Sequence, residues 1–309
     1  MGALNGVNGD VYDIFSILDT RKGGYTLAII LAFLYPILRF TLDRCVFGPI
    51  GRVSFFPKEK KSDDPPTAAL ESRLYKYKVL VILGFYVSFN ESFFTDTRYF
   101  WLGCTVFPPC NYEVSRGLRL LYALELGYYL QASLGSSWCL EVLHLLILQA
   151  VPSLIFWEVR RKDFWENMAH HIATLGLITY SYHVNFVKVG AMVFLCHDIN
   201  DIFMEGAKMA RYAEHKWLPT ALFVVFMLSW FTSRIYYFPV YVIRSVYYEP
   251  INLVAKVYNI NPHPHWEIFL GLLCFLFSLH IYWSYLILKI AYRQLFGDGQ
   301  AEDVREEDD

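Results

Sequence analysis

The sequence lacks most of the patterns that reveal the class of a soluble protein. Its 309 residues carry a net charge of -2. This near-neutral charge points to no class of partner, because Lys and Arg cluster locally, and we expect no nucleic acid to bind. The six cysteines form no CxxC pair and no zinc-ligand spacing. No internal repeat is evident.

The N-terminal region also lacks the features of a cleavable signal peptide. The first apolar run, 24–42, is too long for the hydrophobic part of such a peptide and has no small-residue cleavage site. Position 6 is Gly6, where N-myristoylation requires Ser or Thr. We therefore expect the first apolar run to be retained as a transmembrane span.

Apolar residues are what the sequence has in quantity. Hydrophobic residues make up 55% of the chain, and they gather in runs of about 17 to 22 residues rather than at amphipathic spacing. This pattern predicts an all-α fold, a polytopic transmembrane helix bundle with about seven spans. The predicted spans are 24–42, 79–94, 118–134, 168–182, 189–204, 218–243 and 266–290. A further apolar segment, 138–157, contains Pro152, and whether it crosses the membrane stays open.

The basic residues between the runs predict the topology. The segment 43–78 is the most basic connection, so the positive-inside rule predicts a cytosolic linker at 43–70 and a lumenal N-terminus at 1–23. The later basic clusters favour one net crossing between residues 118 and 157. The tail, 297–309, is acidic and poor in apolar residues, and we expect it to be disordered and cytosolic.

The loop 95–115 then lies in the lumen. Its residues Tyr99, Phe100 and Trp101 are expected to form an interfacial aromatic belt. Cys104 and Cys110 share this loop, and both a disulfide between them and two free thiols are compatible with the sequence.

Ionisable residues inside two neighbouring spans mark the candidate site. Such a residue costs roughly 2.5 to 3.5 kcal/mol near the bilayer centre, so it is a functional candidate by default. The candidates are His170, His171, His197, Asp198, Asp201 and Glu205. If 185–188 is a turn, His171 and Asp201 both lie roughly 20 Å from it, at the same depth. His197, Asp201, Glu205 and Lys208 fall on one helical stripe.

Metal binding is an alternative use of these residues, because three His and two Asp could bind iron or zinc. Membrane di-iron hydroxylases, however, have repeated HxxxH and HxxHH boxes, which are missing around the pair His170-His171. We therefore predict no metal site. The blander alternative is that the histidines only pair across a helix interface.

The two spans carry a specific family resemblance. HHIATLGLITYSY followed by HDINDIFMEGAKMARY resembles the LAG motif of the TLC-domain family, in its ceramide synthase branch of sphingoid base N-acyltransferases, and is most similar to plant-type LAG one homologues. Further similar segments are NESFFTDTRYFW, FWEVRRKDF, LSWFTSRIYYFPVYVI and LHIYWSYLI. The resemblance covers roughly residues 30–307 and implies a TLC domain, which we place at 71–296.

The resemblance implies an acyltransferase of the endoplasmic reticulum membrane, multi-pass, that converts a fatty acyl-CoA and a long-chain sphingoid base, sphinganine or phytosphingosine, to ceramide or dihydroceramide. Acyl-CoA is a co-substrate, and no cofactor is expected. Membrane lipid is a further partner, and a homo- or heterodimer with other ceramide synthases stays open. The alternative is a non-enzymatic TLC-domain lipid sensor or translocation factor, which would not need HH opposite HDxxD.

Carried onto this sequence, the motif assigns catalysis to His170, His171, Asp198 and Asp201. One histidine, oriented by an aspartate, acts as general base or forms an acyl-imidazole, and we favour the acyl-imidazole on His170. His197, Glu205, Arg234, His280, Trp283 and Tyr285 are predicted to line the substrate pocket. Arg160, Arg161, Lys162, Lys208 and Arg211 could meet the phosphates of CoA, although positive-inside topology alone would put them there.

The sequence departs from the family in three respects. Residues 135–154 look like an insertion of about 20 residues, there is no homeobox-like segment, as in plant forms, and the tail EDVREEDD lacks the serines common in the family.

The segment NPHPH, with His263 and His265, is predicted to be a solvated turn.

Overall fold

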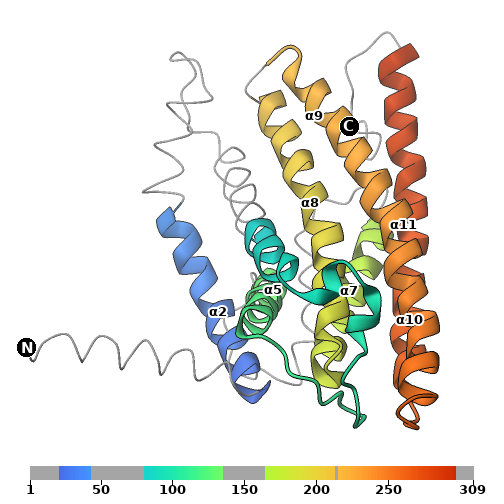
Figure 1. Cartoon of the computed structure of the whole chain (residues 1–309). Coiled ribbons are helices and arrows are strands. Elements are labelled where there is room, and N and C mark those ends of the chain that lie inside the picture. The colour runs from blue at the N-terminus through green and yellow to red at the C-terminus, as the bar shows by residue number, and fades with distance from the viewer. Residues whose placement is uncertain (1–20, 43–79, 135–163, 213–214, 297–309) are drawn as a thin grey trace, which may run out of the picture. The chain divides into compact units, whose positions relative to one another are not determined.

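The computed structural model describes residues 21–42, 80–134, 164–212 and 215–296 (Figure 1). Every regular element in these ranges is a helix of the α, 3-10 or π type, as expected for the all-α class. The predictions for the basic linker, the inserted segment, the acidic tail and most of the N-terminal segment lie outside the described residues. The described residues fall into two compact units.

The first unit contains α2 (Arg21–Leu42), the short helix Leu80–Phe89, α5 (Arg116–Leu134) and α8 (Val187–Tyr212). Glycine lets two of these helices approach closely. A Cβ at Gly127 on α5 would lie 2.9 Å from the backbone oxygen of Ala28 on α2. The aromatic pair Tyr122 and Phe194, with ring centroids 4.9 Å apart, joins α5 to α8. Helix packing in this unit therefore depends on small residues beside large ones.

The second predicted span, 79–94, ends earlier than expected. The helix stops at Phe89, and residues Ser92–Phe94 form the 3-10 turn η3. The side chain of Asn90 donates a hydrogen bond to the carbonyl of Tyr86 at 2.9 Å, the acceptor that a continuing helix would use for its own backbone. This competition explains the early end, which an apolar count does not detect.

The second unit contains η4 (Thr97–Phe100), α7 (Phe164–Val184), part of α9 (Leu218–Trp230), η5 (Phe231–Ile243), α10 (Arg244–Glu249), η6 (Pro250–Ala255) and α11 (His265–Phe296). Helix α11 contacts both α7 and η5 (Figure 1). The helix that starts at α9 continues to Ala255, twelve residues past the predicted end of its span at 243. Residues 245–255 are therefore helical, and the connection between the predicted spans 218–243 and 266–290 is correspondingly shorter.

The π-helical turns explain how this long helix contains Pro239. Proline removes a backbone donor and clashes with the preceding turn of a regular α-helix. The wider turns of η5, Phe231–Ile243, make room for the proline ring. The helix therefore continues past Pro239 with a π-type hydrogen-bond pattern instead of ending there. Such π-helical turns are frequent at functional sites.

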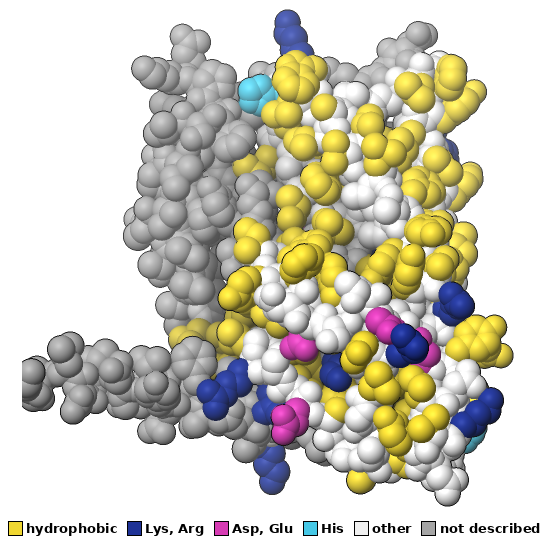
Figure 2. Space-filling view, in the orientation of Figure 1, with side chains coloured by type: hydrophobic (Ala, Val, Ile, Leu, Met, Phe, Trp, Pro, Cys, Tyr) yellow, Lys and Arg dark blue, Asp and Glu magenta, His cyan; other side chains and the backbone are white. Residues whose placement is uncertain are grey.

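Among the residues that the structure describes, two helices are long and apolar enough to cross a membrane, Leu218–Ala255 and His265–Phe296. On α11, one side buries Leu273 and Leu276 while Phe275 and Leu288 remain exposed. Figure 2 shows the same abundance of hydrophobic side chains on the face that it draws. Apolar residues around the whole helix are typical of a membrane span. The predicted total of about seven spans is not confirmed by this criterion.

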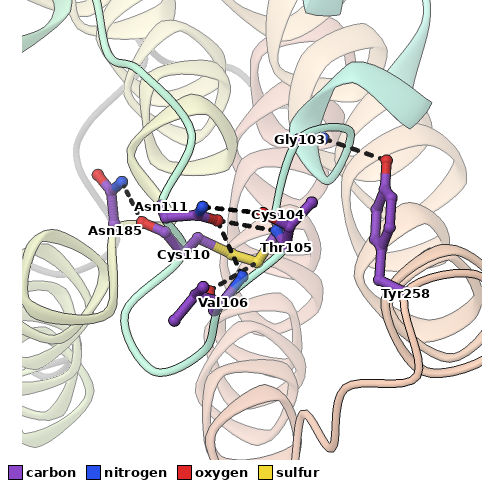
Figure 3. The surroundings of a disulfide bond; sticks show 8 residues. All are labelled: Gly103, Cys104, Thr105, Val106, Cys110, Asn111, Asn185 and Tyr258. Carbon is purple, nitrogen blue, oxygen red and sulfur yellow. Dashed lines mark hydrogen bonds between the residues drawn. A yellow bond between two sulfur atoms is a disulfide. The ribbon is translucent and has the colours of Figure 1, made fainter.

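A disulfide joins Cys104 to Cys110 and closes a small loop (Figure 3). The sequence was compatible with either a disulfide or two free thiols, and the structure has the disulfide. The side-chain oxygen of Asn111 accepts hydrogen bonds from the backbone N–H groups of Thr105 and Val106 at 2.8 and 2.9 Å. The loop is therefore held by its own side chains as well as by the disulfide.

The same loop is fixed to the end of α7. Cys110 donates its N–H to the carbonyl of Val184 at 3.1 Å, and its carbonyl accepts from the side chain of Asn185 at 2.7 Å (Figure 3). Asn185 has a positive φ of 63°, which ends α7. Only Asn185 and Phe186 lie between α7 and α8, so the predicted turn at 185–188 is two residues too long.

The predicted aromatic belt is wrong for Phe100 and Trp101. Each is only 1% exposed, while Tyr99 is 43% exposed. The indole N–H of Trp101 donates to Ser245 Oγ at 3.2 Å, and Ser245 in turn donates to Glu249 at 2.5 Å. A tryptophan is readily buried where its N–H finds an acceptor, and α10 supplies one here.

In the first unit, a lysine at the start of α8 contacts a tyrosine ring. The ammonium group of Lys188 lies 4.0 Å from the ring centroid of Tyr112. Burial raises the pKa of Tyr112 well above its usual range, so its phenol stays protonated. A neutral ring face beneath a cation is the arrangement of a cation–π contact.

Candidate functional site

The histidine pair lies in the first half of α7, in the second unit. His170 and His171 are both half-buried, with ring centroids 5.7 Å apart. Adjacent residues on a helix point about 100° apart, so the two rings meet different neighbours. His170 lies edge-on to Trp283 of α11 at 5.2 Å. The structure thus brings together one predicted histidine and one predicted pocket residue.

A second group of predicted residues lies between η5 and α11 in the same unit. His280 is fully buried, with its ring 5.9 Å from that of Trp230 and 5.2 Å from that of Phe238. The guanidinium of Arg234 lies 4.3 Å from the Trp230 ring centroid, and Arg234 is only 6% exposed. His280 and Arg234 therefore share one aromatic neighbour, Trp230.

Three residues of this group, Trp230, Phe238 and Ser284, were missed by the sequence analysis. Trp230 donates its indole N–H to Ser284 Oγ at 2.9 Å, and Ser284 donates its hydroxyl hydrogen to the carbonyl of His280 at 2.7 Å. The only signal in the sequence is the spacing of Trp230, Arg234 and Phe238 by four residues, which puts them on one side of a helix. We call Trp230, Arg234, Phe238, His280 and Ser284 the tryptophan tier.

Tyr285 does not join this group. Its side chain is 62% exposed, whereas its neighbour Ser284 is 7% exposed. The pocket role predicted for Tyr285 stays a prediction.

The HDxxD residues lie on α8, in the first unit. Asp198 is 7% exposed, while His197 and Asp201 are half-buried. His197 Nδ1 lies 2.6 Å from the carbonyl oxygen of Val193. A carbonyl can only accept, so Nδ1 carries the hydrogen and Nε2 of the neutral ring carries the lone pair.

The predicted stripe of His197, Asp201, Glu205 and Lys208 lies on this single helix. Lys208 Nζ and Glu205 Oε1 are 2.8 Å apart, three residues along the same helix. Glu205 is 3% exposed, so the ion pair compensates a charge that burial would otherwise make costly. Each predicted role, pocket for Glu205 and CoA phosphate for Lys208, stays a prediction.

The remaining basic residues are divided between described and undescribed parts of the chain. Arg211 is exposed near the end of α8. Arg160, Arg161 and Lys162 lie outside the described residues. Within the part of the chain that the structure describes, no three His, Cys, Asp or Glu side chains gather as metal ligands would.

The sequence analysis also missed an acid in the first unit. Glu125 on α5 is only 1% exposed, although it is ionisable and sits in an apolar run. Tyr129, one turn later, interacts electrostatically with Glu125, Asp198 and Asp201. The rule that singled out the α8 carboxylates, an ionisable residue within a predicted span, also applies to Glu125 and could have found it.

Comparison with known proteins agrees with these motifs. The TLC domain family matches residues 146–289. ASC1-like protein 1 of Oryza sativa subsp. japonica is 33% identical over 287 residues, which cover 89% of this chain and 86% of that protein. Ceramide synthase 1 LOH3 of Arabidopsis thaliana is 31% identical over 292 residues, covering 89% and 88%.

The chain belongs to the ceramide synthase family. An animal relative, ceramide synthase hyl-1 of Caenorhabditis elegans, is 35% identical over 239 residues, covering 75% of this chain and 58% of that protein. The resemblance to the ceramide synthase family that the sequence analysis described is confirmed. Together with the two apolar helices, the TLC domain makes the chain a membrane protein.

Proposed function

We propose that this protein is a ceramide synthase, an enzyme that transfers a fatty acyl group from acyl-CoA to the amine of sphinganine or phytosphingosine. The observation that carries the proposal is near full-length similarity to proteins named ceramide synthase, at 31% and 32% identity over 89% of the chain. The histidine pair and the HDxxD residues add support. Ionisable side chains within apolar helices are energetically unfavourable in a membrane, so those that occur there usually have a function.

The first half of the proposed reaction uses His170. Its imidazole nitrogen attacks the carbonyl carbon of the acyl thioester, an N–C bond forms, and the C–S bond breaks. The leaving thiolate of CoA takes up the proton that the imidazole ring loses, and the acyl group is held as a neutral acyl-imidazole. The contact with Trp283 at 5.2 Å favours His170 over His171 for this role, because it fixes the orientation of the ring.

In the second half, the amine of the sphingoid base attacks the acyl-imidazole. The amide C–N bond forms, the bond to His170 breaks, and the proton that the amine loses passes to the imidazole ring, directly or through a carboxylate. Asp198 or Asp201 takes part as the carboxylate that orients the histidine or receives that proton. His171 is the alternative general base.

Further residues are assigned to binding in this proposal. Arg234, His280 and Trp283 line the acceptor and acyl pocket together with His197 and Glu205, and the basic residues Arg160, Arg161, Lys162, Lys208 and Arg211 meet the phosphates of CoA. Acyl-CoA is the co-substrate, and the reaction as balanced above needs no cofactor.

We also propose the location and assembly that fit this substrate pair. The protein resides in the endoplasmic reticulum membrane with about seven spans, and it forms homo- or heterodimers with other ceramide synthases. Two long apolar helices support a multi-pass arrangement.

The test is expression of the chain in cells that lack ceramide synthase, followed by measurement of ceramide from a panel of acyl-CoAs. His170→Ala, His171→Ala and Asp201→Asn are assayed beside the unchanged chain at equal protein level. Ceramide formation that depends on these residues supports the proposal. No product from the unchanged chain would point to a lipid sensor or translocation factor. Full activity in all three variants would instead rule out the mechanism proposed here for these residues.

A further inference from the structure

Thr174 on α7 has a buried hydroxyl group with no hydrogen-bond partner among the residues that the structure describes. A buried hydroxyl without a partner destabilises a fold, because it has given up its hydrogen bonds to water. A threonine within a helix can avoid this by donating to the carbonyl four residues earlier. Thr232 does so, to Leu228 at 2.8 Å. Thr174 does not, so its hydroxyl remains available as a donor.

Thr174 lies one helical turn after the histidine pair. It follows His170 by four residues and His171 by three, and these spacings bring Cβ atoms to about 5 to 6 Å from each other on one side of a helix. The Cα–Cβ bonds of an α-helix tilt towards its N-terminus, so the side chain of Thr174 leans towards the turn that carries His170. Its hydroxyl is therefore within reach of an acyl group held on the His170 ring.

The helix that packs on α7 has mainly apolar side chains at this level. Contacts of His170 with Trp283 and of Tyr180 with His265 show that α11 runs antiparallel to α7. Between these two contacts, α11 buries leucines at three positions and the single histidine His280, whose ring packs against the tryptophan tier. The leucines are Leu273, Leu276 and Leu279. Apolar surroundings strengthen a hydrogen bond that the hydroxyl makes to a bound substrate.

Both halves of the proposed reaction need such a donor. The attack of His170 on the thioester and the attack of the amine on the acyl-imidazole each form a tetrahedral intermediate, in which the former carbonyl oxygen is negatively charged. A donor that is already placed where this charge develops lowers the barrier, most of all in a site of low dielectric constant. The Thr174 hydroxyl can meet that oxygen without first breaking a hydrogen bond within the protein.

We propose that Thr174 is a further catalytic residue, whose hydroxyl donates a hydrogen bond to the acyl oxygen of the tetrahedral intermediates formed at His170. This inference rests on the proposed function. The hydroxyl keeps its proton throughout. When the C–S bond breaks in the first half, or the bond to His170 in the second, the electron pair on the oxygen re-forms the carbonyl group.

The test uses purified full-length protein in lipid nanodiscs. Product mass spectrometry gives kcat and KM for acyl-CoA, and the mass of the intact protein, mixed with acyl-CoA alone, gives the rate of acylation. Thr174→Val replaces the hydroxyl with a methyl group, and Thr174→Ser keeps it. Ser88→Ala is a matched control that removes another buried hydroxyl without a partner. Thr232→Val is a second control that removes a paired one.

We expect Thr174→Val to lower kcat and the acylation rate about 10²-fold, with KM changed less than about twofold. Its Tm should not fall, because no hydrogen bond within the protein is lost. Thr174→Ser should stay within about threefold of the unchanged chain in kcat. Ser88→Ala and Thr232→Val should keep full activity. If Thr174→Val yields too little protein, Thr174→Ala compared with Thr174→Ser tests the same hydroxyl.

Three results would overturn the inference while leaving the proposed function intact. They are an unchanged kcat in the variants without the hydroxyl, a loss that appears only in KM or in protein yield and Tm, and an acyl group that peptide mapping locates on Thr174 itself, which would make it the nucleophile. If the unchanged chain makes no ceramide, the proposed function itself fails, and this outcome is separate from the other three.

Discussion

The polar residues of α8 and those of the tryptophan tier are held in different ways. On α8, two contacts lie within the helix, since His197 bonds to Val193 and Glu205 pairs with Lys208, although Asp198 and Asp201 also interact with Tyr129 of α5. In the tryptophan tier, the partners come from a facing helix, since Trp230 of α9 bonds to Ser284 of α11. Groups satisfied within one helix keep their orientation when neighbours move, whereas groups held across helices depend on the packing of the unit.

The largest expected effect separates the two histidines of α7. His170→Ala should lower kcat/KM on the order of 10³-fold, because it removes the proposed nucleophile. His171→Ala should lower it by about tenfold, since the ring contact with Trp283 belongs to His170. Ceramide formation is measured at matched protein level. Equal losses in the two variants would contradict the assignment of His170 as the nucleophile. They would also mean that the contact between His170 and Trp283 does not distinguish the two histidines.

A pair of glycines compares helix packing in the two units. Gly127→Ala puts a Cβ 2.9 Å from the backbone oxygen of Ala28 and from Leu31 Cβ, so α2 must shift. We expect a loss of about 1 to 3 kcal/mol in stability, seen as a lower Tm.

Gly176→Ala on α7 is the matched control, because no atom lies within 4 Å of its added Cβ. Relief of the glycine entropy cost should stabilise this variant by about 0.5 to 1 kcal/mol. If the two variants behaved alike, the close approach of α5 to α2 would not contribute to stability.

The disulfide loop offers a smaller effect in the second unit. Asn185→Ala loses the hydrogen bond to the Cys110 carbonyl and places alanine at a φ of 63°. Asn259→Ala shares the positive φ, at 54°, but Asn259 is exposed. The buried hydrogen bond should make Asn185→Ala the less stable variant by about 1 kcal/mol. The comparison is of thermal unfolding in the same detergent, and equal Tm values would mean that the bond adds nothing.

The sequence was sufficient where a rule acts within one helix. The apolar runs and their ionisable residues located α7 and α8 and placed His197, Asp201, Glu205 and Lys208 on one stripe. Periodicity determines which residues share a face, and it needs no knowledge of the neighbouring helices. The predicted segments are therefore helical where expected and wrong mainly at their ends, as at Phe89, while their number as membrane spans is not confirmed.

The sequence was insufficient where a partner comes from far along the chain. Nothing near Trp101 shows that Ser245, 144 positions later, accepts its N–H, so the residue looked interfacial. The same holds for Trp230 and Ser284, separated by 54 positions. Pro239 was another limit, because the π-helical turns that accommodate it have no signature in apolar periodicity.

The smallest expected effect concerns two histidines of the segment NPHPH, which was predicted to be a solvated turn. His263 fits that prediction, since it is exposed and pairs with Glu267, also largely exposed. His265 does not, because its Nδ1 lies 2.7 Å from the Tyr180 hydroxyl and its ring packs edge-on to Phe107 at 5.4 Å.

His263→Ala should change stability by less than about 0.5 kcal/mol, as the loss of an exposed ion pair does, and the change should be smaller still at high salt. His265→Ala loses a contact between α7 and α11 and should cost about 1 kcal/mol at any salt concentration. Unfolding in low and high salt separates the two, and a salt-dependent loss in His265→Ala would show that its contact is electrostatic rather than packed.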